Sequence, residues 1–157
     1  MIKNRKKTVV LGLGNPLMSD EGVGGFIVNK LEKTVSEKFP EVDFIDAGTG
    51  GMSLLYLIEG REKVIIIDCA FMKTEPGTVK RFTPKMVDTV KKLAHYSLHE
   101  ADVLKVIDIS NQLGKCPEEI ILFGIEPETI EPGDQFSKTI NCRVDDYLEL
   151  ILEELQA

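Results

Sequence analysis

The order of apolar and amphipathic segments predicts a three-layer α/β/α sandwich. Short runs of almost continuous apolar residues alternate with longer segments whose apolar residues recur at helical spacing, a pattern typical of strands buried between layers of helices. The run KVIIIDC at 63–69 is the most apolar and is expected to form a central parallel strand. Right-handed crossovers between such strands place helices on both faces of one sheet.

The segments follow the order strand, helix, strand, helix, strand, strand, helix, helix, strand, helix. The expected strands are 8–14, 42–48, 63–69, an edge strand within 75–82 after the turn Pro76-Gly77, and 118–127. The expected helices are 23–35, a short helix near 52–58, a weaker helix from Pro84, 98–113 with Gly114 as its C-cap, and a closing helix with an apolar stripe over 140–155.

Composition limits the class of protein. The 157 residues fit a single domain, 1–157, that is long enough to bury a core. Nineteen Lys and Arg residues against 26 Asp and Glu residues give a net charge of -7, which argues against a nucleic acid or an anionic membrane as partner. The three cysteines form no CxxC pair, which suits a reducing compartment better than a disulfide framework.

No segment has the features of a membrane anchor or a signal peptide. The N-terminus is basic, but its apolar run ends at Gly14-Asn15-Pro16, and a signal peptide needs a longer apolar region. No stretch approaches the roughly 20 apolar residues that span a bilayer. The sequence therefore predicts a soluble, cytoplasmic protein with no membrane insertion.

Polar residues gather where the predicted strands end, and ligands of such sheets bind beyond the carboxyl ends of the strands. The loop GNPLMSDEG follows the first strand, DAGTGG follows the second, and Asp68 stands at the end of the third. A phosphate site uses glycines and bare backbone N–H groups at a helix start, whereas Asp20 and Glu21 would repel a phosphate and attract a cation. The same two acids also fit an ordinary structural role, because carboxylates complement the dipole of a helix that follows them.

A second candidate ligand comes from a predicted helix start. Ser97 and Glu100 are spaced as a capping box, which places His99 in the first helical turn. The positive end of the helix dipole disfavours the imidazolium form, so His99 is expected to be neutral and able to bind a metal ion. Two carboxylates and one neutral imidazole form a ligand set that suits Zn, Ni or a similar divalent ion, although a histidine in a capped turn is often purely structural.

Other kinds of catalytic site fit the sequence poorly. There is no GxSxG motif of a serine hydrolase. Cys69 follows Asp68 directly, and successive side chains of a strand face opposite ways. If Asp68 faces the crevice, Cys69 does not, which argues against a Cys-His nucleophile pair. His95 precedes the cap and has no acidic neighbours, so we interpret it as a surface residue.

Five motifs in order, GLGNPLMSDEGVG, DAGTGG, VIIIDCA, SLHEADVL and GIEPETIEPG, resemble those of the endopeptidases that mature [NiFe] hydrogenases. The resemblance covers about four-fifths of the chain and, between Phe71 and Tyr96, extends only to PGTV. It implies an α/β/α fold with a mostly parallel five-stranded sheet. It also implies three metal ligands that act in catalysis, Glu21, Asp68 and His99, and substrate contacts beside the cleft from Asp20, Asp46, Gly48 and Thr49.

The reaction implied by this resemblance is a single peptide cleavage. Such enzymes remove a C-terminal extension from the precursor of the hydrogenase large subunit after nickel has been inserted. The nickel would be presented by the precursor, and Zn or Cd would substitute in vitro. A bound ion would polarise the scissile carbonyl or lower the pKa of an attacking water, and Asp20 or Asp68 would handle protons. The expected partner is the precursor, and the expected oligomeric state is a monomer.

Two other functions remain open from the sequence. A module that senses nickel, or that acts as a chaperone for hydrogenase assembly without cleaving, would use the same ligands. The motif GLGNP is also found in peptidyl-tRNA hydrolase, an esterase of similar general fold. That family places a histidine shortly after the motif, whereas here the first histidine is His95, and the acidic charge does not suit tRNA.

Overall fold

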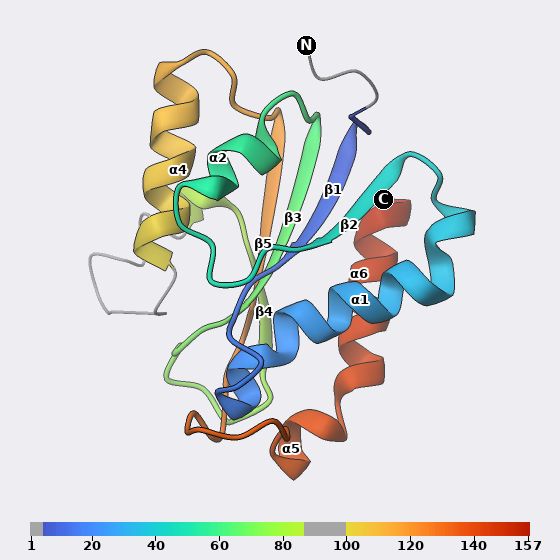
Figure 1. The fold of residues 1–157 in the computed structure, drawn as a ribbon, viewed down its shortest axis with the longest axis vertical. Helices are drawn as coiled ribbons and strands as arrows, with labels where there is room; N and C mark the ends of the chain where they lie inside the picture. Colours follow the sequence, from blue (N-terminus) through green and yellow to red (C-terminus); the bar gives the residue numbers. More distant parts are fainter. Residues whose placement is uncertain (1–4, 87–99) are drawn as a thin grey trace.

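The computed structural model describes residues 5–86 and 100–157 and contains one five-stranded sheet (Figure 1). The strand order is β2-β1-β3-β5-β4, in which the first four strands are parallel and β4 is antiparallel to β5. The strands are β1 Thr8–Gly12, β2 Val42–Asp46, β3 Lys63–Cys69, β4 Val79–Phe82 and β5 Glu119–Ile125. The predicted α/β sandwich with a mostly parallel sheet is confirmed.

Helices cover both faces of this sheet, with α1 and α6 on one face and α2 and α4 on the other (Figure 1). The α-helices are α1 Val23–Val35, α2 Ser53–Ile58, α4 Glu100–Gln112, α5 Lys138–Asn141 and α6 Val144–Gln156, and the 3-10 helices are η1 Ser19–Gly22 and η2 Ser36–Lys38. None of the helices in the described ranges is long and apolar enough to cross a membrane.

Three of the predicted helices differ from the structure or extend beyond its described residues. The closing helix is divided into α5 and α6, because the backbone leaves helical geometry at Arg143, whose N–H donates to the Ile140 carbonyl at 3.0 Å. Ser137 caps α5 by accepting a hydrogen bond from the Ile140 N–H. The predicted cap of α4 at Ser97, and most of the weaker helix after Pro84, lie outside the described residues.

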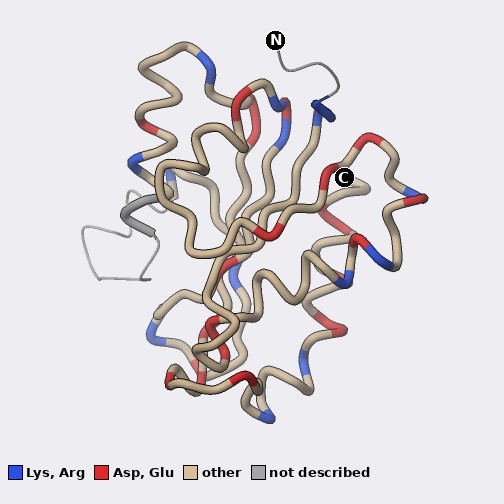
Figure 2. Tube along the Cα trace, viewed as in Figure 1, with Lys and Arg blue, Asp and Glu red and all other residues tan. Residues whose placement is uncertain are grey.

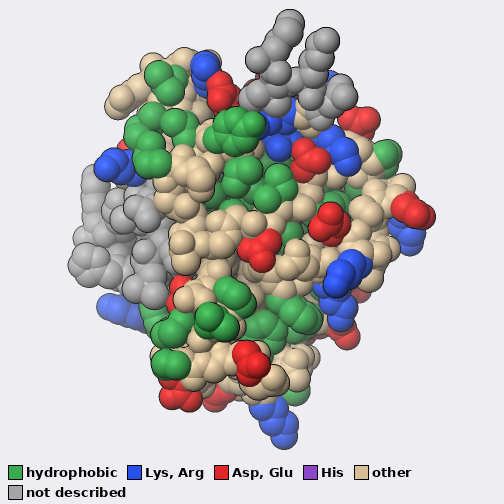
Figure 3. Space-filling view, in the orientation of Figure 1, with side chains coloured by type: hydrophobic (Ala, Val, Ile, Leu, Met, Phe, Trp, Pro, Cys, Tyr) green, Lys and Arg blue, Asp and Glu red, His purple; other side chains and the backbone are tan. Residues whose placement is uncertain are grey.

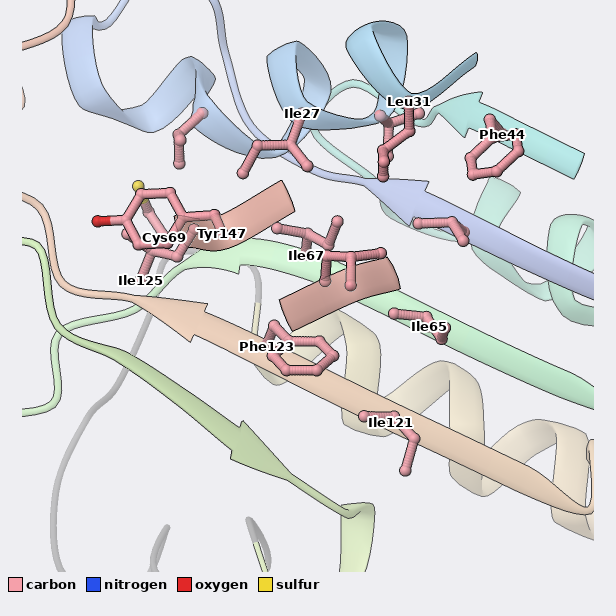
Figure 4. Close-up of a cluster of buried hydrophobic side chains, with 14 of the residues drawn as sticks. Ile27, Leu31, Phe44, Ile65, Ile67, Cys69, Ile121, Phe123, Ile125 and Tyr147 are labelled. Atoms are coloured by element: carbon pink, nitrogen blue, oxygen red, sulfur yellow. The ribbon is translucent and has the colours of Figure 1, made fainter. Parts of the chain in front are cut away.

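The side chains of β3 divide the core into two layers. Ile65, Ile67 and Cys69 face the layer of α1 and α6, whereas Val64 and Ile66 face the layer of α2 and α4. Figure 4 shows the first of these layers, in which the Tyr147 ring lies beside Cys69 and Ile125. Each fully buried aliphatic side chain of this kind contributes about 1.5–3 kcal/mol to stability.

Glycine allows α1 to approach the ends of two strands. A Cβ atom on Gly24 would lie 2.4 Å from the Ile67 carbonyl oxygen and 2.5 Å from the Leu13 carbonyl oxygen. These atoms belong to the backbone and cannot move aside without disturbing the sheet. The glycine therefore brings the first turn of α1 directly against the carboxyl ends of β1 and β3.

Tyr147 connects α6 to the loop before β4. Its hydroxyl donates a hydrogen bond to the buried Gly77 carbonyl at 2.6 Å. Burial raises the pKa of Tyr147 to about 12, since the charged phenolate is poorly solvated inside the protein.

We expect Tyr147→Phe to lower the free energy of unfolding by about 1–3 kcal/mol at neutral pH, because the Gly77 carbonyl loses its buried donor. In the wild type, the unfolded chain releases the Tyr147 proton near pH 10, below the folded pKa of about 12. Wild-type stability therefore falls as the pH rises through this window, and the variant lacks that loss. Urea unfolding of both proteins at pH 8 and pH 11 should show the stability gap narrowing; a constant gap would contradict the assignment.

Candidate active site

The site lies where the strand order reverses. The chain leaves β1 for β2 on one side and later places β3 on the other side, so the loops after β1 and β3 diverge around a crevice. Gly12 of β1 pairs with Asp46 of β2 and with Ile67 of β3. The loops after β1 and β2 therefore begin at the same level of the sheet, and β3 extends two residues beyond it, through Asp68 to Cys69.

Glu21 is placed by a loop that folds back over the end of β1. Gly14 has a φ of 129°, and a Cβ there would lie 1.8 Å from the Glu21 carbonyl oxygen. Only glycine allows both this backbone conformation and this approach. The turn delivers Glu21 within η1, where its side chain is largely buried at 5% exposure.

Asp68 ends β3 on the opposite side of the strand from Cys69. Strand alternation puts it on the face of Ile66, toward the layer of α2 and α4, with 9% exposure. The carboxylates of Asp68 and Glu21 both act electrostatically on the Cys69 thiol. The structure thus brings two of the three predicted ligands to the same edge of the sheet.

His99, the third predicted ligand, lies outside the described residues. It immediately precedes Glu100, the first residue of α4. Within 5–86 and 100–157, no group of three or more His, Cys, Asp and Glu residues is arranged to hold a metal ion. The proposed set of Glu21, Asp68 and His99 therefore stays a prediction.

Asp20 lies inside the protein, with an exposure of 0%. Its carboxylate accepts hydrogen bonds from the Glu128 and Thr129 N–H groups, both at 2.9 Å. It also accepts from the Ser137 N–H at 2.7 Å and from the Ser137 hydroxyl at 2.8 Å. Asp20 thus has no surface to offer for the substrate contact that the sequence predicted, and its position favours a structural role.

The loop 126–137 after β5 is held against the loop after β1. The Ser19 N–H donates to the Gly133 carbonyl at 2.9 Å, and the Gly133 N–H donates to the Leu17 carbonyl at 2.9 Å. The Asp20 N–H donates to the Thr129 carbonyl at 3.1 Å. Two motifs separated by about a hundred residues of sequence therefore form one structural unit.

The loop after β2 borders a groove of about 380 Å³. Asp46 lines this groove, and its carboxylate accepts a hydrogen bond from the Gly48 N–H at 3.0 Å. The Gly48 carbonyl in turn accepts from the Gly14 N–H at 2.7 Å, and Thr49 is exposed. Strand alternation places Asp46 on the α1 face, across the sheet from Asp68.

Two aromatic residues from different parts of the chain line the same groove. Phe26 comes from α1 and Phe136 from the loop 126–137, and their rings meet edge to face with centroids 5.2 Å apart. Among the residues that the structure describes, no Lys or Arg lines the groove, whereas Asp46 and Asp134 do. The groove therefore offers apolar surface and negative charge to a ligand.

The environment of Cys69 does not suit a nucleophile. Its thiol is 5% exposed and donates to the Asp20 carbonyl at 3.0 Å. Burial raises the pKa of Cys69 well above its usual value, and the charges of Asp68, Asp20, Glu21 and Glu126 raise it further. The thiolate, which is the reactive form, is thus strongly disfavoured.

Glu126 is a residue of this edge that the sequence analysis missed. It follows β5 and is buried, and its carboxylate accepts from the Met72 N–H at 3.0 Å and from the Thr74 N–H at 2.9 Å. It thereby fixes the loop that follows β3. The signal that singled out Asp68, an acid at the end of an apolar strand, is equally present at Glu126.

The outer surface of this edge is acidic and partly apolar. Figure 2 shows Asp and Glu positions in the loops at the lower end of the molecule, where the exposed side chains of Glu128, Glu131 and Asp134 belong to the loop 126–137. On the face drawn in Figure 3, hydrophobic side chains also gather near the lower edge. Leu17, in the loop after β1, is 67% exposed.

Comparisons with known proteins agree on one family. The family model of hydrogenase maturation proteases matches residues 26–154. The chain is 32% identical to the hydrogenase 2 maturation protease of Escherichia coli strain K12, over 96% of this chain and 91% of that protein. The fold is similar to that of the hydrogenase maturating endopeptidase HybD from E. coli, with a TM-score of 0.81, 29% identity, and coverage of 96% of this chain and 92% of that one.

A second solved structure, a hydrogenase 2 maturation peptidase from Thaumarchaeota archaeon SCGC_AB-539-E09, has a TM-score of 0.72 and 26% identity, over 96% of this chain and 99% of that one. The sequence and structural similarities thus extend over nearly the whole chain. They agree with the arrangement of the loops after β1, β2 and β3 at one edge of the sheet. This chain belongs to the hydrogenase maturation protease family.

Proposed function

We propose that this chain is an endopeptidase that removes the C-terminal extension from the nickel-loaded precursor of a [NiFe] hydrogenase large subunit. The observation that carries the proposal is the position of Glu21 and Asp68 at the switch point of the sheet, in a chain of this family. The groove on the α1 face of this edge, lined by Gly22 next to Glu21, has the apolar and polar lining that suits a peptide segment. The proposed setting is the cytoplasm, and the proposed form is a monomer.

In the proposed reaction, the nickel belongs to the substrate. Glu21, Asp68 and His99 engage the ion that the precursor carries, which limits cleavage to precursors already loaded with metal. The ion supplies Lewis-acid chemistry at the scissile peptide. Asp68 is the remaining candidate for proton handling, because Asp20 is fully buried and its oxygens accept four hydrogen bonds. Asp46 lines the groove, and Asp46, Gly48 and Thr49 are proposed to orient the peptide.

We expect Glu21→Gln to reduce cleavage of the nickel-loaded precursor by at least about 100-fold, the scale of losing an interaction made mainly in the transition state. The variant keeps the size of the side chain and removes its charge. Release of the C-terminal peptide, followed by mass spectrometry, measures the effect. Glu37→Gln is the matched control, because it removes the same charge from an exposed residue of η2.

Glu37→Gln should cleave at the wild-type rate. Normal cleavage by Glu21→Gln would contradict the site. If the wild type binds the loaded precursor but releases no peptide, a module that senses nickel without cleaving replaces the protease as the function.

The ligand set can be tested without the precursor. The chain has two histidines, His95 and His99, so their imidazole NMR signals can be followed while Zn²⁺ or Cd²⁺ is added. We expect one set of signals to shift, His99→Ala to abolish that response, and Glu21→Gln to weaken it by about tenfold or more, as metal sites lose affinity when a ligand is removed. His95→Ala is the control and should leave the response intact. A response that comes from His95 alone would contradict the set.

A further inference from the structure

We propose that Asp20 is a positioning residue, whose buried carboxylate holds the loop 126–137 in place and so shapes the groove that receives the precursor. The inference rests on the proposed function, because that function assigns the groove to the precursor. In this view the adjacent acids Asp20 and Glu21 have different tasks. Glu21 is directed at the substrate's ion, and Asp20 is directed inward at the loop.

The carboxylate of Asp20 grips the loop at two separated points. One oxygen, Oδ2, accepts from the Glu128 N–H, the Thr129 N–H and the Ser137 hydroxyl, and the other oxygen, Oδ1, accepts from the Ser137 N–H. The first two donors lie at the start of the loop and Ser137 lies at its end. All four groups are hydrogen-bond donors, and three of them are backbone N–H groups. A carboxylate satisfies them all, because both of its oxygens accept hydrogen bonds.

The segment between these two points forms one wall of the groove. It carries Asp134, Gln135 and Phe136, all of which line the groove. The Phe136 ring also contacts the ring of Phe26 in α1, which lines the same groove. Ser137, the last residue held by Asp20, follows Phe136 directly, so releasing it frees the wall at the point where the aromatic side chain is attached.

A direct role in the chemistry is incompatible with the position of Asp20. Its exposure is 0%, and each oxygen is already used by the loop. Asp20 acts on the precursor only through the residues that it positions. Its loss should therefore weaken binding of the precursor more than it slows cleavage of the bound precursor.

Asp20→Asn tests this role, because the amide has nearly the same shape as the carboxylate. Its NH2 group, however, is a donor and cannot accept a hydrogen bond from the loop. We expect KM for the nickel-loaded precursor to rise by about tenfold or more, the effect of losing one hydrogen bond to a charged group, while kcat falls by less than about threefold. The backbone N–H groups of Glu128, Thr129 and Ser137 should exchange faster with solvent, as measured by NMR. Glu37→Gln is the control, since its side chain is exposed and lies in η2, outside the loop; it should match the wild type in KM and in exchange.

Ser137 provides a milder pair of variants if Asp20→Asn does not fold. Ser137→Ala removes the hydroxyl that donates to Asp20 at 2.8 Å, and Ser137→Thr restores a hydroxyl. We expect Ser137→Ala to raise KM and to accelerate exchange at Glu128 and Thr129, and Ser137→Thr to recover both. A purely structural loss of stability would lower Tm without separating KM from kcat in this way.

Three results would overturn the positioning role. They are a loss of kcat at unchanged KM, a rise in KM while the three N–H groups stay protected, and wild-type behaviour of both Asp20→Asn and Ser137→Ala. The affinity for the precursor can be compared between Glu21→Gln and the double variant that also carries Asp20→Asn. This measurement requires no cleavage. If the wild type fails to cleave, the proposed function fails, while this affinity and the exchange rates still decide whether Asp20 positions the groove.

Discussion

The buried carboxylate of Asp20 joins the loop after β1 to the loop 126–137. The arrangement of the site at the carboxyl ends of the strands depends on these two loops. Removing an ionised side chain from water costs several kcal/mol, and Asp20 has no exposed surface. Each hydrogen bond to a charged acceptor contributes about 1.5–3 kcal/mol, so the four donors of the loop 126–137 offset that cost. The loop and the ionised carboxylate therefore stabilise each other, and neither arrangement is favourable alone.

The same arrangement recurs once at this edge, with Glu126 as the acceptor. Asp20 ties the loop after β5 to the loop after β1, and Glu126 ties the loop after β3 to the end of β5. Three loops from strands β1, β5 and β3 are thus linked in series by two buried acids. Glu21 lies on the first of these loops and Asp68 lies in β3 just before the last of them, so the links help to fix the positions of the two predicted ligands relative to each other.

The sheet was predictable from sequence because its signals are local. The run 63–69 is apolar at nearly every position, and it forms the central strand β3, buried on both faces. Gly14 has a positive φ and allows the turn after β1. Gly24 serves a different purpose, the close approach of α1 to β1 and β3, and that depends on packing between elements that no local pattern records.

The task of Asp20 was not predictable for the same reason. Its partners lie 108 to 117 residues away in the sequence, and an acid before a helix looks the same whether it faces a ligand or a loop. The start of the closing helix depends likewise on Ser137, whose hydroxyl donates to Asp20 and accepts from the Ile140 N–H in the first turn of α5. Asp20, the loop 126–137 and the N-terminus of α5 therefore belong to one network, which is centred on a single side chain.

A protein that acts on a folded protein substrate needs a site that is open to the substrate and whose residues are already held in place. Loops provide the opening, but side chains on loops are held less accurately than those on strands or helices. Here the close contact at Gly24 fixes the start of α1, and the carboxylates of Asp20 and Glu126 fix the loops by hydrogen bonds to their backbones. Less conformational entropy is then lost when a partner binds, because the walls of the groove are ordered beforehand by the protein's own buried charges.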